Sequence, residues 1–202
     1  MTHSGPRVGI FGGAFDPPHN AHHMLARAAI DQLRLDVLHI LPTGQAWHKP
    51  RRLTDGTHRL AMARLAFADL PQAQVDDREL RRSGPSYSLD TARELLAQYP
   101  GCQLFLVLGE DQARALPTWH GWRELLSIAT ISIAKRQDST PARGTIDALN
   151  GAQGRFLPLQ TDAMALSATA IRARAAQGES IAALVCGPVA RYIDHHHLYQ
   201  TA

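Results

Sequence analysis

The sequence predicts an α/β fold in which a parallel sheet is flanked by helices. Short apolar runs alternate along the chain with segments whose apolar residues recur at helical spacing. Most of these runs are aliphatic or β-branched without polar alternation, which is typical of strands buried on both faces. Alternating strands and helices favour parallel pairing, and ligands then bind at the carboxyl edge of the sheet. We therefore expect a Rossmann-like parallel sheet, with strands over residues 8–11, 37–41, 73–77, 103–108, 128–134 and 155–159.

Helices are expected between these strands. The apolar spacing predicts one helix from Ala21 to Leu33 and another over residues 57–70, which Pro71 closes. Ser88 is a suitable N-cap for a helix that ends near Tyr99. The polar stretch 137–154 is interpreted as a long surface loop or a loosely attached helix, without a chemical role. Further helices are expected after Ser167 and over residues 188–199.

Composition limits the function classes. A chain of 202 residues fits one domain over 1–202, with a small helical C-terminal part from about residue 167. With 45% hydrophobic and 19% charged residues, no membrane-length apolar run and no secretion signal at the start, we expect a cytoplasmic protein without a membrane partner. Cys102 and Cys186 are isolated, which argues against disulfides and structural zinc. The net charge of +3 does not by itself imply nucleic-acid binding.

The stretch from Val8 to His23 predicts a strand, a glycine turn and a helix. Paired glycines at the turn permit positive φ and let a ligand approach the backbone. From Pro18 the helix start carries no carboxylate before Asp31, and histidines and Arg27 occupy the space instead. Imidazoles and unpaired N–H groups at a helix start make a phosphate site. The alternative is a glycine turn before a core helix with exposed histidines.

Residues 12–22, GGAFDPPHNAH, resemble the opening motif G-G-[TS]-F-D-P-x-H-x-G-H of the HIGH-type nucleotidyltransferase superfamily. They are not a G-x-G-x-x-G or Walker loop. Two positions depart from the motif: Ala14 replaces a hydroxyl residue, and Ala21 replaces a glycine, where its methyl group narrows the approach to the nucleotide. The resemblance implies that ATP contacts Gly12, Gly13, Phe15, His19 and His22.

Residues 166–172 form a second candidate anion site. Ser167 is a good N-cap, the first turn again lacks acid, and Arg172 can reach back over the helix start. Taken alone, an ordinary capped helix explains these residues. The segment resembles the superfamily motif I-S-[SA]-T-x-I-R, which implies that Ser167, Thr169 and Arg172 also contact ATP.

Three further segments resemble bacterial nicotinate-nucleotide adenylyltransferases. Residues 47–49 are similar to their P-H-K segment, although Trp47 stands where the proline would be, and residues 79–91 match E-x-x-R-x-G-x-S-Y-[ST]-x-D-T. The C-terminal residues 188–199 are similar as well. The resemblance implies that the nicotinate nucleotide contacts Asp16, His48, Lys49, Ser88, Asp111 and Trp119.

Several of these residues also have simpler interpretations. Basic loop residues are often only solvated, and Glu110 and Asp111 could cap a helix instead of holding a hydroxyl or a magnesium-bound water. Tryptophans pack in cores, which we accept for Trp122, whereas the resemblance places Trp119 against the nicotinate ring. The run His195–His197 is better explained as a solvated helix end than as a metal site.

The expected function is adenylyl transfer from ATP to nicotinate mononucleotide, giving deamido-NAD and pyrophosphate. His19, His22, Lys49 and Arg172 are the expected catalytic residues, acting by alignment and charge stabilisation. Mg²⁺ is expected mainly on the ATP phosphates, with no metal held by the protein itself. The alternatives are another adenylyltransferase such as pantetheine-phosphate adenylyltransferase, a silent nucleotide sensor, or a metal-dependent hydrolase. Homo-oligomer formation and the choice between nicotinate and nicotinamide stay open.

Overall fold

The computed structural model describes residues 5–44, 53–136, 154–161 and 166–200, and its centre is a parallel sheet. The strand order is β3-β2-β1-β4-β5-β6, and every neighbouring pair is parallel. This confirms the predicted Rossmann-like sheet flanked by helices. The strands are β1 (Arg7–Gly13), β2 (Val37–Pro42), β3 (Ala73–Val75), β4 (Gln103–Leu108), β5 (Thr130–Arg136) and β6 (Arg155–Thr161).

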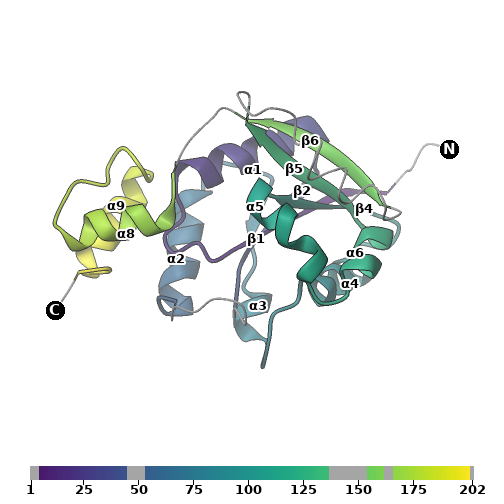
Figure 1. Ribbon diagram of the computed structural model, residues 1–202, viewed down its shortest axis with the longest axis horizontal. Helices are drawn as coiled ribbons and strands as arrows, with labels where there is room; N and C mark the ends of the chain where they lie inside the picture. The colour runs from purple at the N-terminus through teal and green to yellow at the C-terminus, as the bar shows by residue number, and fades with distance from the viewer. Residues whose placement is uncertain (1–4, 45–52, 137–153, 162–165, 201–202) are drawn as a thin grey trace.

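Helices connect the strands and cover both faces of the sheet (Figure 1). One face packs on α1, α2, α8 and α9, around a core that includes Phe15, Met62 and Val189. The other face packs on α4, α5 and α6, around Leu95, Leu106 and Leu125. The helices are α1 (Asn20–Leu33), α2 (Gly56–Ala66), α3 (Arg78–Arg81), α4 (Ser88–Gln98), α5 (Glu110–Ala115), α6 (Trp122–Ile128), α8 (Ala168–Ala176) and α9 (Gly187–His195), with a 3-10 turn η1 (Leu116–Thr118).

The order of the strands determines where a ligand can bind. Leaving β1, the chain builds β2 and β3 on one side and then crosses to build β4, β5 and β6 on the other. Open parallel sheets bind ligands at the carboxyl ends of the strands where this direction reverses. That point lies between β1 and β4, next to the turn that follows Gly13.

Several local predictions were wrong. Ile128 ends α6 rather than starting β5, because its apolar side chain packs against the core from the helix. Ser88 is the first residue of α4, and Tyr87 occupies the N-cap position without a side-chain cap. Helix α2 ends at Ala66, before the predicted boundary at Leu70. The short helix α3 lies after β3 where no helix was predicted.

The C-terminal helices α8 and α9 lie beside α2 at one end of the molecule (Figure 1). Ile171, Val189 and Ile193 are buried there and join the same core as α1 and α2. The C-terminal part is therefore continuous with the core of the sheet layer. No helix in the described part of the chain is both long and apolar enough to cross a membrane.

Candidate active site

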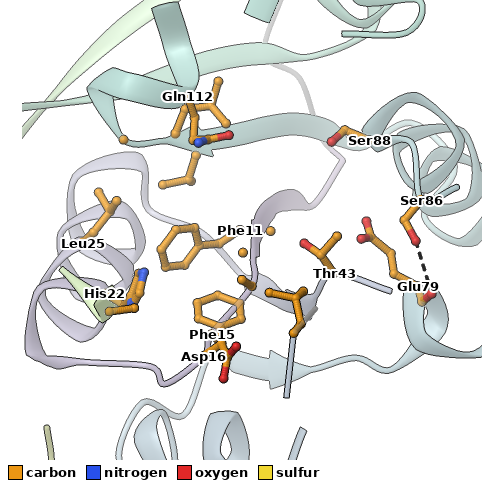
Figure 2. Close-up of a pocket in the computed structure, with 18 of the residues that line it drawn as sticks. Phe11, Phe15, Asp16, His22, Leu25, Thr43, Glu79, Ser86, Ser88 and Gln112 are labelled. Carbon is orange, nitrogen blue, oxygen red and sulfur yellow. Dashed lines mark hydrogen bonds between the residues drawn. The ribbon is translucent and has the colours of Figure 1, made fainter. Parts of the chain in front are cut away.

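A cavity of about 670 Å³ opens at the carboxyl edge of the sheet, at the point where the strand order reverses. Figure 2 shows His22 and Leu25 on one side of the hollow and Glu79 and Ser86 on the other, with Phe11 and Phe15 between them. The ends of β1 and β4, the starts of α1, α4 and α5, and the start of α8 all contribute lining residues. The polar or glycine residues among them are Gly12, Gly13, Asp16, His19, His22, Thr43, Glu79, Ser86, Tyr87, Ser88, Gly109, Gln112, Trp119, His120, Thr169 and Arg172.

The glycine turn differs from its expected conformation. Gly12 and Gly13 are the last residues of β1, and neither has positive φ. The left-handed residue is Phe15, with φ 46°, and its buried ring lies 3.1 to 3.3 Å from the position of a Cβ on Gly13. A Cβ on Gly12 would meet no atom within 4 Å. A glycine at position 13 therefore leaves room for the ring of Phe15. Gly12 instead borders the open space of the cavity.

His19 and His22 stack at the start of α1. Their ring centroids are 3.7 Å apart with an interplanar angle of 23°, and both rings line the cavity. Nδ1 of His22 accepts a hydrogen bond from the backbone N–H of His19 at 3.2 Å. A neutral His22 therefore carries its proton on Nε2. The first turn contains no acidic residue, as the sequence predicted.

The imidazole of His19 is neutral at physiological pH. The side chain is 8% exposed, and this burial lowers its pKa from 6.5 to about 4. Its buried Nδ1 faces the His22 backbone N–H in a capping-box arrangement that falls short of a full hydrogen bond.

Asp16 is buried at the centre of the turn and is bonded to three other segments. Its carboxylate accepts from the Tyr199 hydroxyl at 2.8 Å and from the Thr54 N–H at 3.2 Å. Its backbone carbonyl accepts from Nη1 of Arg172 at 2.8 Å. The residue is 1% exposed, so its carboxylate offers little surface to a nucleotide and mainly holds the turn through these hydrogen bonds.

The start of α8 faces the same cavity. Ser167 is the N-cap as predicted, and its hydroxyl accepts from the Ala170 N–H at 3.1 Å, although Ser167 does not line the cavity. Thr169 and Arg172 do line it, and Nη2 of Arg172 donates to Oγ1 of Thr169 at 3.1 Å. The structure thus brings the two predicted anion sites together across about 150 residues of sequence.

Only some of the residues expected to contact the nicotinate nucleotide line the cavity. Asp16, Ser88 and Trp119 line the cavity, and Trp119 packs at the same time on the core beneath α4 and α6. Asp111 is exposed on the first turn of α5 and does not line the cavity, whereas its neighbour Gln112 does. His48 and Lys49 lie outside the described residues.

Sequence reasoning gave no role to Glu79, which lines the cavity from α3 and is 5% exposed. Its carboxylate accepts from the Thr91 hydroxyl at 2.9 Å, and desolvation raises the pKa of the carboxyl above its usual value. Tyr87 and His120 were also missed; their rings stack 4.3 Å apart at the cavity wall. Glu79 and Tyr87 fall within the motif at residues 79–91, but nothing in the sequence shows that they face a cavity.

Comparisons with known proteins agree with this geometry. A family model described as cytidylyltransferase-like matches residues 10–174. A probable nicotinate-nucleotide adenylyltransferase of Albidiferax ferrireducens is 56% identical over 196 residues, covering 97% of this chain and 99% of the relative. Another, from Methylibium petroleiphilum, is 43% identical and covers 96% of this chain and 92% of the relative.

The chain belongs to the nicotinate-nucleotide adenylyltransferases of this cytidylyltransferase-like family. The fold agrees with a solved structure, the Plasmodium falciparum nicotinic acid mononucleotide adenylyltransferase complexed with NaAD. The TM-score is 0.80 at 17% identity, and the match covers 96% of this chain and 97% of the other. At that identity the likeness supports the fold.

Two residues of this adenylyltransferase family member depart from the superfamily motif. Ala14 lines the cavity, and its carbonyl accepts from Nη1 of the buried Arg59 at 2.9 Å, so a backbone group supports the turn at this position. Ala21 is not among the residues that line the cavity. The expected narrowing of the nucleotide approach by its methyl group is therefore not seen in this geometry.

Proposed function

We propose that this protein transfers the adenylyl group of ATP to nicotinate mononucleotide, releasing pyrophosphate and forming deamido-NAD. The observation that carries the proposal is a single cavity lined by His19 and His22, by Thr169 and Arg172, and by Ser88 and Trp119. These three sets come from segments far apart in the chain. The cavity volume of about 670 Å³ lies within the usual range of small-molecule and cofactor sites.

The reaction needs alignment more than covalent chemistry. A phosphate oxygen of the mononucleotide attacks the α-phosphorus of ATP, and the bond from that phosphorus to the pyrophosphate oxygen breaks in line. Negative charge grows on the oxygens of the transferring group, so aimed N–H donors accelerate the step. We assign this role to Nε2–H of His22, to neutral His19 and to the guanidinium of Arg172, with Lys49 as the fourth candidate.

ATP is expected to bring Mg²⁺ with it. Within the described ranges, no group of three or more His, Cys, Asp or Glu residues is arranged to hold a metal. The carboxylates among the described lining residues are Asp16 and Glu79, and both already accept hydrogen bonds from neighbouring residues. This lining suits an ion held by substrate phosphates and water, which would neutralise phosphate charge.

The remaining assignments concern the acceptor. Ser88 and Trp119 are proposed to orient the nicotinate nucleotide, with His48 as an additional candidate. Asp111 is a weaker candidate than Gln112, because only Gln112 lines the cavity. We also propose that the protein is cytoplasmic, which cell fractionation tests. Formation of a homo-oligomer is a further proposal, which light scattering tests.

The test is pyrophosphate release from ATP, Mg²⁺ and nicotinate mononucleotide, with nicotinamide mononucleotide and phosphopantetheine in parallel reactions. We expect rapid release with the nicotinate nucleotide. Release only with phosphopantetheine would assign the alternative transferase reaction. ATP binding, measured by calorimetry, without release from any acceptor would leave a nucleotide-binding protein that has lost catalysis.

A further inference from the structure

Tyr199, near the C-terminus, reaches the phosphate-binding turn near the N-terminus. Its hydroxyl donates to Oδ1 of Asp16 at 2.8 Å, across 183 positions of sequence. The backbone of Tyr199 has φ 68°, in the left-handed region that large side chains rarely adopt. Such a conformation costs free energy and persists where surrounding contacts require it. The hydrogen bond to Asp16 and packing against the core around α2 are the contacts seen here.

The turn itself depends on such contacts. Phe15, directly before Asp16, is also left-handed, with φ 46°. Asp16 joins this strained residue to the loop before α2 through Thr54, to α8 through Arg172, and to the C-terminal end through Tyr199. Its carboxylate stands only three residues before His19, where a negative charge opposes the binding of phosphate. A hydroxyl donor therefore has two effects here: it holds the turn and it offsets part of that charge.

We propose that Tyr199 is a positioning residue for adenylyl transfer, acting through Asp16 to hold His19 and His22 in the orientation that binds the transferring phosphate. This inference rests on the proposed function. It gives α9 and the residues that follow it a role at the reaction centre, although the described residues after Arg172 do not line the cavity. The hydroxyl remains a donor at every physiological pH, because burial and the neighbouring Asp16 raise its pKa well above the usual range.

The first test compares Tyr199→Phe with Tyr192→Phe. Tyr192 lies in α9, is hydrogen-bonded to Nδ1 of His58 at 3.0 Å and does not line the cavity, so its variant loses a similar hydroxyl without touching the turn. We expect Tyr199→Phe to lower kcat about tenfold with a smaller change in KM, and Tyr192→Phe to leave kcat unchanged. Equal kcat for Tyr199→Phe and wild type would overturn the proposal, as would equal losses in the two variants.

A double-mutant cycle tests the route through Asp16. Asp16→Ala removes both carboxylate oxygens, so neither Tyr199 nor Thr54 keeps its acceptor. If Tyr199 acts through Asp16, adding Tyr199→Phe to Asp16→Ala changes kcat by less than twofold. Additive losses would mean that Tyr199 acts elsewhere.

Imidazole NMR resonances separate a failure of this inference from a failure of the proposed function. Tyr199→Phe is expected to shift the ring signals of His19 and His22 but not of His23, and this readout needs no turnover. If wild-type protein releases no pyrophosphate, the shifts still judge the positioning role. Should Tyr199→Phe not fold, Asp16→Ala is read in the same way. Unchanged His19 and His22 signals in the folded variant would overturn the proposal.

Discussion

The spacing of three residues between His19 and His22 brings their imidazoles together at the start of α1 and determines which nitrogen of His22 is the donor. His22 uses Nδ1 to accept from the His19 backbone, which leaves Nε2 as the donor. His22→Ala is expected to lower kcat by roughly two to three decades with a smaller change in KM, because the contact strengthens in the transition state. Steady-state pyrophosphate release measures both constants.

His23→Ala is the matched control for this variant. His23 is the next residue, but its Nε2 is bonded to Asp69 at 2.8 Å, and its side chain does not line the cavity. We expect its kcat to stay within about twofold of wild type, as for surface substitutions away from a site. Weaker binding of both substrates by His22→Ala, with kcat kept, would contradict the assignment of a transition-state contact.

For single residues, the sequence predicted which side chains line the cavity better than it predicted their protonation states and hydrogen bonds. His19, His22, Thr169 and Arg172 were placed by motif and spacing, and all line the cavity. The neutral state of His19 depends on burial by residues distant in sequence, so spacing could not predict it. The bond from Asp16 to Tyr199 was missed for the same reason, since a pair 183 positions apart leaves no local pattern.

At the scale of elements, Glu79 joins the short helix α3 to α4 through Thr91 inside the cavity wall. The raised pKa of its carboxyl means that the folded protein binds a proton more tightly than the unfolded chain does. This contribution to stability is complete below the unfolded pKa and is lost as pH rises through the folded value. At neutral pH, therefore, the buried charge destabilises the pair of helices.

Glu79→Gln is expected to raise the free energy of unfolding by roughly 1 kcal/mol near neutral pH and to change it little under acid conditions. Glutamine keeps an acceptor for Thr91 but carries no charge. Urea unfolding at several pH values measures the difference. Glu94→Gln is the control on α4, because Glu94 is half exposed and bonded to Arg78 and Arg82. A gain that is the same at every pH would show that charge burial is not its cause.

Element boundaries were predicted less well than the elements themselves. Helix α3 spans four residues, too few for a periodic pattern to show, and the sequence offered no other signal for it. Ile128 looked like the first residue of a strand because β-branched residues favour strands, but its packing from α6 decided otherwise. The strands themselves were found because burial on both faces makes them uniformly apolar.

At the scale of the whole molecule, the parallel sheet followed from the alternation of strands and helices, whereas the strand order did not. Right-handed crossovers fix the hand of each connection but leave open on which side of β1 the next strand pairs. The chain crosses from β3 to β4 beside β1, and that crossing creates the cavity. The C-terminal helices then complete the site by packing on α2, as Ile171 and Val189 show.

The pH dependence of folding follows from groups distributed over this architecture. Unfolded His19 has a pKa of 6.5 and the folded residue about 4, so between these values only the unfolded chain binds the proton. Stability is therefore expected to fall as pH drops through this window, by on the order of 3 kcal/mol in total from His19. Burial raises the pKa of Asp76, but the hydrogen bonds from His39 and Arg78 together outweigh it and hold the pKa below the usual value. The contribution of Asp76 to stability is therefore lost only below its unfolded value of 3.8.

His19→Asn isolates this contribution, because asparagine does not titrate. Glu79 has the opposite effect on stability above pH 4.5, because its pKa is raised in the folded protein. The comparison is therefore best made in a Glu79→Gln background. There the change in the free energy of unfolding between about pH 6.5 and 4.5 comes from His19 without the contribution of Glu79. The free energy of unfolding in urea is expected to decline toward acid pH in the Glu79→Gln protein, and to decline less when His19→Asn is added. ATP should reduce the acid loss further, since an anion beside the imidazole raises its pKa and binds the folded state alone. Parallel curves for the single and double variants would mean that His19 binds its proton equally well in the folded and the unfolded chain, so that burial does not lower its pKa.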